Sequence, residues 1–167
     1  MRKNQEVQDI VINDLQFSDK YISSDVRKLC NNLSNPYSVS MHFRRTDFLN
    51  AENKAIFNTI SYSYYSEALK KIEKLIGHKP IIYLFSDDSD YIKDINFEGY
   101  ETYPISQEND YEDFYLMSHT KHHIIANSTF SWWSAILGET DGITIAPQKW
   151  YKSEFTPNIF FDDWILL

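Results

Sequence analysis

The sequence predicts an α/β fold, with a Rossmann-like, mostly parallel sheet and helices on both faces. Strand-type and helix-type segments alternate along the chain from residue 23 onward. The run PIIYLFS, residues 80–86, is continuously apolar and of strand length, as expected for a strand covered on both faces. Polar clusters follow three predicted strands, which is where open parallel sheets bind their ligands.

The first half of the chain supplies two helices and two strands. Residues 23–33 begin with Ser and Asp, typical capping residues, and are predicted to form a short helix. Residues 38–44 alternate with a period of two, which predicts a strand with His42 and Arg44 on the same side. A loop is expected at the start of residues 50–60, and a helix over 65–76 that Gly77 ends. The apolar strand at 80–86 follows.

The second half continues the alternation. A helix is expected to begin near Asp88, and a weaker strand over 100–105 follows it. Asp110 is a capping candidate for a further helix over 110–118. The remaining predictions are a strand at 122–128, a helix at 128–138 capped by Ser128 and ended by Gly138, and a last strand at 142–147.

Composition limits the class of protein. The 167 residues are 43% apolar and 24% charged, as in a soluble globular domain. A net charge of −8 argues against binding nucleic acid or an anionic membrane over a general basic surface. Because we find no signal peptide and no membrane-length apolar run, we expect a cytoplasmic location, with peripheral attachment to the inner face of the membrane left open. The single Cys30 is expected to be a packed thiol.

Three polar clusters should meet in one cleft. They are RRTD at 44–47, SDD at 86–88 and NSTFS at 127–131, each following a predicted strand. Arg44 and Arg45 are planar cations suited to bidentate binding of phosphate or carboxylate, although a solvated surface pair bridged to acids is the alternative.

The other two clusters allow more than one role. The start of the helix at Ser128 offers free backbone N–H groups and hydroxyls to an anion, whereas ordinary capping is the simpler role. Asp87 and Asp88 could bind a ribose or a base, cap the next helix or act as a general base. Trp132 and Trp133 are expected in the core rather than at a ligand.

Several cofactor chemistries are excluded. The four glycines do not form a G-x-G-x-x-G or P-loop pattern, so nicotinamide and Walker-type sites are not expected. His119, His122 and His123 do not fit a zinc site because their predicted directions diverge and no Cys or Glu completes the set. The acidic SDDSD run suggests metal binding of the kind found in manganese-dependent glycosyltransferases. The arginine pair offers the alternative way to neutralise a diphosphate.

Four stretches together resemble family 11 glycosyltransferases, the α-1,2-fucosyltransferases. They are SVSMHFRRTDF, YLFSDDSDYIK, FYLMSHTKHHIIANSTFSWWSAILG and IAPQKWY. The resemblance implies an inverting enzyme that transfers fucose from GDP-fucose to a galactose-terminated glycan, with no metal and no other cofactor. Thr46 stands where this family usually has glycine, and Ile136 replaces a common aromatic residue.

The resemblance also implies roles for individual residues. Arg44 and Arg45 would stabilise the negative charge that grows on GDP, and Asp47 would orient an arginine. His42 would contact the phosphate or ribose, and Asp87 would lie on the nucleotide side. The remaining donor-binding candidates are Ser86, Asn127, Ser128, Thr129 and Ser131. The general base stays unassigned, with Asp47 and the carboxylates of the SDD cluster as candidates.

The resemblance implies that this chain contains only one of the two domains that members of the family have. Members of the family look like GT-B enzymes with two facing Rossmann-type domains, and residues 37–167 resemble the C-terminal, GDP-fucose-binding one, with 1–36 as a lead-in. A separate acceptor-domain chain is therefore a possible partner, and no acceptor-dependent transfer is expected from this chain alone. The alternatives are an inactive remnant that binds GDP or a GDP-sugar, and a non-enzymatic phosphate-binding α/β domain.

Overall fold

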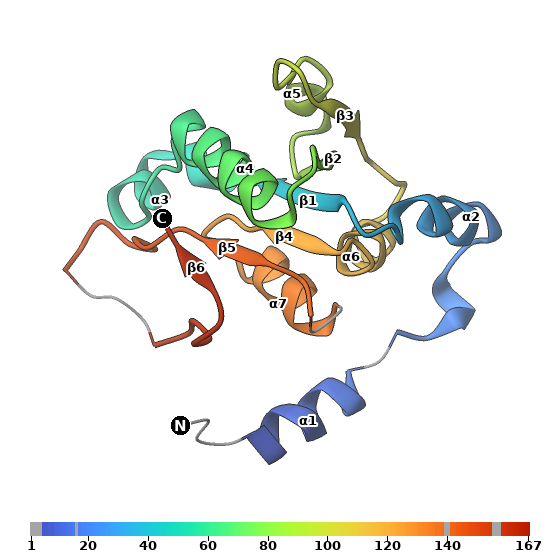
Figure 1. Ribbon diagram of the computed structural model, residues 1–167. Helices are drawn as coiled ribbons and strands as arrows, with labels where there is room; N and C mark the ends of the chain where they lie inside the picture. Colours follow the sequence, from blue (N-terminus) through green and yellow to red (C-terminus); the bar gives the residue numbers. More distant parts are fainter. Residues whose placement is uncertain (1–4, 16, 139–140, 155–157) are drawn as a thin grey trace.

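A six-stranded parallel sheet forms the centre of the molecule (Figure 1). The computed structural model describes residues 5–15, 17–138, 141–154 and 158–167. The strand order is β3-β2-β1-β4-β5-β6, and every pair is parallel. The strands are β1 (Ser38–Phe43), β2 (Ile81–Ser86), β3 (Glu101–Pro104), β4 (His122–Ile124), β5 (Thr144–Ala146) and β6 (Ile165–Leu166).

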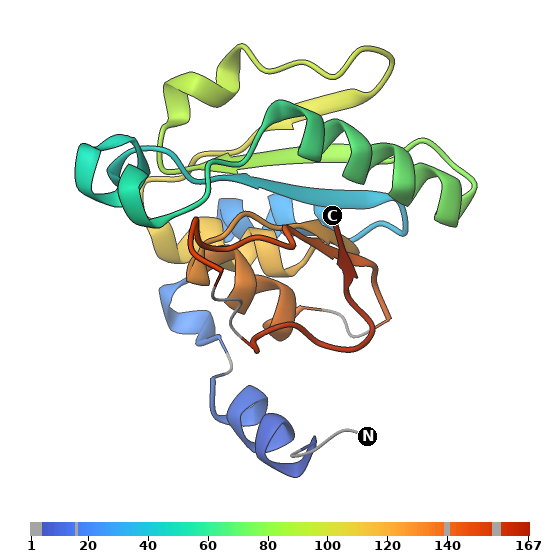
Figure 2. The same cartoon turned by 90° about the vertical axis from the view of Figure 1, so that its left-hand side faces the viewer.

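Helices cover both faces of this sheet (Figure 2), which confirms the predicted fold class. One face packs against α4 (Tyr62–Ile76) and α5 (Ser89–Lys93). The other packs against α2 (Ser24–Leu33) and α6 (Asp110–Ser118), with α7 (Thr129–Leu137) beside them. Gly77 ends α4 in the left-handed conformation, at φ 69°, as its position in the sequence predicts.

The central strand β1 is buried along its whole length and still shows a clear alternation. Val39, Met41 and Phe43 pack into the core beneath α4. Ser40 and His42 point to the opposite face, where α6 and α7 lie. The predicted strand and its period of two are therefore confirmed, and the alternation places His42 under the start of α7.

Some local predictions need correction. A short helix, α3 (Ala51–Ile56), replaces the loop expected after residue 50, because the Asn50 side chain accepts a hydrogen bond from the backbone N–H of Asn53 and caps it. Asn109 rather than Asp110 caps α6. The strand predicted at 122–128 is shorter, since β4 ends at Ile124. Ser128 occupies the N-cap position of α7, but its side chain makes no capping hydrogen bond.

The segment before β1 divides into two parts. Helix α1 (Gln5–Asp14) lies apart from the rest of the molecule in both views (Figures 1 and 2), and the 3₁₀ helix η1 (Asp19–Tyr21) follows it. Helix α2 instead buries Val26, Cys30 and Leu33 against α6, with Cys30 as the packed thiol that the sequence predicts. Residues from α2 onward thus belong to the same core as the sheet. No helix within the described ranges has the length and hydrophobicity to span a bilayer.

Candidate active site at the carboxyl edge of the sheet

The loop after β1 is held by one carboxylate from the end of β2. Asp87 accepts hydrogen bonds from the backbone N–H groups of Arg45, at 2.8 Å, and Thr46, at 3.0 Å, and from the Thr46 hydroxyl. The 3₁₀ helix η2 (Asp47–Leu49) follows directly. Two of the three predicted clusters therefore meet at this edge, and the register of β1 with β2 explains why, since Phe43 pairs with Ser86.

These contacts determine the charge state of Asp87. Its side chain is only 17% exposed, and burial raises the pKa of the carboxyl. The hydrogen bonds from Thr46 and Arg45, together with the Arg44 guanidinium, outweigh burial, so the pKa lies below its usual value. Asp87 is ionised at neutral pH and already has several donors. Its contacts here position the arginine loop, while its predicted contact with a nucleotide stays a prediction.

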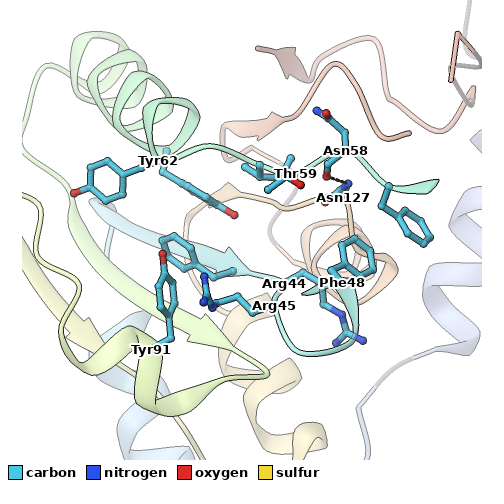
Figure 3. A pocket seen from close by; sticks show the side chains of 12 residues that line it. Arg44, Arg45, Phe48, Asn58, Thr59, Tyr62, Tyr91 and Asn127 are labelled. Atoms are coloured by element: carbon cyan, nitrogen blue, oxygen red, sulfur yellow. Dashed lines mark hydrogen bonds between the residues drawn. The ribbon is translucent and has the colours of Figure 1, made fainter. Parts of the chain in front are cut away.

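The two arginines point in different directions (Figure 3). Arg44 Nη2 lies 2.8 Å from Asp47 Oδ2 and Arg44 Nη1 lies 3.4 Å from Asp87 Oδ2. Two carboxylates from separate segments thus orient one guanidinium, which is 29% exposed. Of its five N–H groups, those that do not face Asp47 and Asp87 remain for a ligand. Asp47 thus lies where it can orient Arg44, which is the role that the family resemblance implies for it.

Arg45 turns toward α5 instead. Its Nε lies 3.3 Å from Asp88 Oδ2, and its Cζ lies 3.5 Å from the centre of the Tyr91 ring (Figure 3). Asp88 also caps α5, because its Oδ1 accepts from the backbone N–H of Tyr91. The guanidinium is therefore stacked and hydrogen-bonded in one orientation, which limits the entropy that it loses when it binds a ligand.

Acids outnumber the arginines at this edge. Asp47, Asp87 and Asp88 surround Arg44 and Arg45, so the group has no net positive charge. An anion would be recognised here by directed hydrogen bonds rather than by the overall charge of the protein.

A small hollow lies on the α6 and α7 side of β1, and Arg44 lines it. The other lining residues are His42, Phe85, Ser86, Asp87, Asp110, Asp113 and Phe130. His42 is 3% exposed, and its Nδ1 has no hydrogen-bond partner among the described residues. Burial lowers the pKa of His42 to about 4, so the imidazole is neutral at physiological pH. Nε2 of His123 is buried and without a partner among the described residues in the same way. A ligand or a water molecule in the hollow would satisfy Nδ1 of His42.

Asp113 is one of the lining residues that sequence reasoning missed, together with Phe85, Asp110 and Phe130. Burial, with the nearby charges of Asp110 and Glu112, raises its pKa to about 6 although the backbone N–H of Gln107 donates to it at 3.0 Å. Its position in the first turn of α6 looks like ordinary helix capping in the sequence. Only the packing of α6 beside β2 brings this carboxyl into the same hollow as His42.

The third predicted cluster has mixed placement. Thr129 is exposed in the first turn of α7, and Ser128 before it leaves the helix start without a side-chain cap. Ser131 is fully buried, and its hydroxyl donates to the backbone carbonyl of Ser128 at 3.2 Å, so the expected contact of Ser131 with a ligand is not available in this structure. The Ser86 hydroxyl donates to the Phe43 carbonyl at 2.8 Å and joins β1 to β2.

Asn127 connects three segments beneath the site. Its side-chain nitrogen donates to the backbone carbonyls of Asn58, at 2.8 Å, and Trp150, at 2.9 Å, while the residue itself lines a cleft. Trp132 packs against the core beside the C-terminal segment, and its indole N–H donates to the Ile159 carbonyl. Trp132 and Trp133 are both only half-buried, so the expected core position is met in part.

This cleft lies on the α4 side of the arginine loop (Figure 3). Both arginines line it, and most of the rest of its surface is aromatic. The lining residues are Phe43, Arg44, Arg45, Phe48, Phe57, Asn58, Thr59, Ile60, Tyr62, Tyr65, Tyr91 and Asn127. Sequence reasoning missed the aromatic residues because they come from five places in the fold, namely β1, η2, the end of α3, α4 and α5. Arg44 is common to this cleft and to the hollow around His42.

The described residues contain no group of three or more His, Cys, Asp or Glu side chains arranged to hold a metal ion. His122 is used structurally, since its Nδ1 accepts from the backbone N–H of Ile143 at 3.0 Å. His123 contacts the Ser40 hydroxyl at 2.8 Å through its Nδ1. These two histidines therefore serve the core at the amino-terminal half of the sheet.

Comparison with known proteins identifies the family. An O-antigen biosynthesis glycosyltransferase, WbnK of Escherichia coli, is 33% identical over 160 residues, which cover 87% of this chain and 52% of WbnK. An α-1,2-colitosyltransferase of the same organism is 35% identical over 144 residues, covering 83% of this chain and 49% of that enzyme. The chain therefore spans about half the length of these curated relatives.

A crystal structure of POFUT1 in its apo form aligns with a TM-score of 0.48 and 17% identity, over 73% of this chain and 43% of that chain. Residues 4–167 match the profile of glycosyl transferase family 11. On this match and on the two relatives, the chain belongs to glycosyl transferase family 11.

Proposed function

We propose that this chain is the donor-binding half of an inverting α-1,2-fucosyltransferase and that it holds GDP-fucose across the arginine loop. The observation that carries the proposal is the position of Arg44, which lines two adjoining spaces on either side of β1. A nucleotide sugar has a base and a sugar joined by a diphosphate. An arginine between two spaces is suited to the central diphosphate.

The hollow around His42 suits the guanine end. Guanine presents two neighbouring N–H donors, on N1 and N2, and a carboxylate can accept both. Asp113 offers such a carboxylate, Phe130 offers an apolar contact, and the unpaired Nδ1 of His42 lacks a partner that a ligand could provide. Adenine and uracil do not present this pair of donors, so the hollow favours a guanine nucleotide.

The diphosphate would lie between Arg44 and the start of α7. This helix has nine residues and no side-chain cap, so its first N–H groups are suited to an anion. When the bond from the sugar to the β-phosphate breaks, negative charge grows on the leaving oxygen. Arg44, already oriented by Asp47 and Asp87, would stabilise that charge without further reorganisation.

The acceptor in this proposal is a galactose-terminated glycan, and the location is cytoplasmic. Direct inversion needs an acceptor hydroxyl in line with the anomeric carbon and a base to remove its proton. Much of that alignment would come from the part that the longer relatives have in addition to the matched half. The donor site described here would need no metal, because Arg44, Arg45 and a helix start interact with the diphosphate.

Titration of the purified chain with GDP, ADP and UDP in buffer containing EDTA tests this proposal. We expect GDP to bind at least about tenfold more tightly than ADP or UDP, since adenine or uracil would leave the half-buried Asp113 carboxyl without its paired donors. Binding that requires added manganese or magnesium would reassign Asp87 and Asp88 as metal ligands. Equal affinity for the three nucleotides would show that the hollow does not recognise guanine.

The affinity for GDP should depend on pH through Asp113. A carboxyl must be ionised to accept two hydrogen bonds, and the pKa of Asp113 is raised to about 6. The affinity should therefore rise as the pH increases from 5 to 7. If the protein with a protonated Asp113 does not bind GDP at all, the rise is about tenfold. His42 cannot cause this change, because its pKa of about 4 keeps it neutral across the range.

Calorimetric titrations at pH 5, 6 and 7 with the parent chain and Asp113→Asn would measure the effect. The variant should bind GDP weakly and lose the part of this pH dependence that Asp113 causes. The second ionisation of the terminal phosphate of GDP, with a pKa of about 6, contributes equally in both proteins. An unchanged profile in the variant would show that another group titrates.

A further inference from the structure

The cleft on the α4 side has two aromatic walls (Figure 3). Phe48 and Phe57 form one wall, with stacked rings whose centres lie 4.3 Å apart. Tyr62 and Tyr91 belong to the other, and each is held by a neighbour. Tyr62 stacks on Phe97 at 5.0 Å, and the Arg45 guanidinium covers the Tyr91 ring. These rings are therefore fixed before any ligand arrives.

Polar groups lie among the aromatic side chains. Asn58, Thr59 and Asn127 line the cleft together with the two arginines (Figure 3). None of the described residues that line it is acidic, whereas the hollow around His42 has three carboxylates among its lining residues, Asp87, Asp110 and Asp113. The two spaces that share Arg44 thus differ strongly in chemistry.

This difference assigns the two ends of a nucleotide sugar. Guanine offers hydrogen-bond donors to carboxylates, so it matches the acidic hollow. A sugar ring presents C–H groups that pack on aromatic faces and hydroxyls that bond to amides and to a threonine, so it matches the aromatic cleft.

We propose that the aromatic cleft holds the sugar of the donor and that Phe48 selects a 6-deoxy sugar. This inference rests on the function proposed above. In such a donor the C6 methyl is separated from the anomeric carbon only by C5 and the ring oxygen. The methyl therefore lies near the phosphate on Arg44, and the apolar group that receives it must be next to Arg44.

Phe48 meets this requirement. The Arg44 guanidinium carbon lies 5.7 Å from the centre of the Phe48 ring, and the Phe57 ring stacks on that ring. A methyl group buries apolar surface against the ring. A 6-hydroxyl at the same place would lose its water without gaining an acceptor from the benzene ring, which disfavours the 6-hydroxy sugar.

The test compares GDP, GDP-L-fucose and GDP-L-galactose, because the two sugars differ only in the 6-hydroxyl. Dissociation constants are measured by calorimetry for the parent chain, Phe48→Leu and Phe48→Ala. We expect the parent to prefer GDP-L-fucose over GDP-L-galactose by about tenfold. Phe48→Leu should retain most of that preference, since leucine also presents an apolar group. Phe48→Ala should reduce it to within about twofold, because the wall is lost.

Tyr103→Ala is the matched control. Tyr103 is an exposed aromatic residue on the edge strand β3, away from both spaces, and its removal should leave all three dissociation constants unchanged. Melting temperatures establish that each variant is folded.

The outcomes separate the two proposals. If GDP does not bind the parent chain, the proposed function fails and the assignment of the sugar fails with it. If GDP binds but the parent does not distinguish the two sugars, or Phe48→Ala keeps the full preference, only the role of Phe48 is overturned. Because GDP has no sugar at this position, its affinity also reports any disturbance of Arg44 by the Phe48 substitutions.

Discussion

Arg44→Ala is expected to weaken GDP binding by at least about tenfold, which corresponds to the loss of about 1.5 kcal/mol from a charge-assisted hydrogen bond. The side chain lines both spaces at the carboxyl edge of the sheet, and Asp47 and Asp87 hold its guanidinium in place. In a complete enzyme the same change should reduce the transfer rate by about a hundred- to a thousandfold, because a preorganised donor to the leaving group is lost.

Two related variants sharpen this experiment. Arg44→Lys should restore little of the affinity, since an ammonium group lacks the planar fork that the two carboxylates orient. Arg45→Ala should also weaken binding by at least about 1.5 kcal/mol, although the Arg45 side chain contacts Asp88 and Tyr91, and only its backbone N–H contacts Asp87. Calorimetry gives the affinities, and thermal unfolding checks stability. If both alanine variants bound GDP as tightly as the parent chain, Arg44 and Arg45 would not bind the diphosphate.

Gly138→Ala should be among the most destabilising single substitutions in this chain. A Cβ at residue 138 would lie 2.7 Å from the backbone carbonyl oxygen of Ser118 and 2.9 Å from Nε2 of His123. Neither neighbour moves easily, because one is backbone and the other is a ring that is 1% exposed. We expect the free energy of unfolding to fall by about 2 to 3 kcal/mol and the melting temperature to fall by roughly 5 to 10 °C.

Gly77→Ala is the matched control for this prediction. Gly77 has a positive φ of 69°, but no atom lies within 4 Å of the place that an alanine Cβ would occupy, so alanine there meets conformational strain alone. That strain costs about 1 kcal/mol. In chemical unfolding, the free energy of unfolding of Gly138→Ala should therefore be well below that of Gly77→Ala. The reverse order would show that the packing around His123 relaxes to admit a methyl group.

The sequence predicts the sheet well because its signals are local. The period of two in β1, the apolar run of β2 and the glycine that ends α4 each depend on neighbouring residues only. Helix α3 was missed because its main start signal is a single Asn50 cap on a polar stretch with no buried face. Helix α1 gives no strong pattern, and in the structure it lies apart from the core.

The candidate site is predictable to a lesser degree. The parallel order of the strands makes the carboxyl-edge position of Arg44, Asp87 and Ser128 a consequence of topology, and the family resemblance agrees with it. Within that edge, side-chain direction depends on tertiary contacts. Asp87 binds two backbone N–H groups of the arginine loop, and Ser131 turns into its own helix, neither of which the sequence pattern indicates.

The sequence by itself determined the alternation of strands and helices, the position of the arginine pair at the end of a strand and the family. Each of these follows from residues near one another in the chain or from motifs kept in order. Only the tertiary structure decided that Arg44 and Arg45 diverge, that Asp113 shares a hollow with His42 and that Phe48 and Phe57 form a wall beside Arg44. The physical reason is that these side chains come from different segments, and only packing of the helices against the sheet fixes their distances and burial.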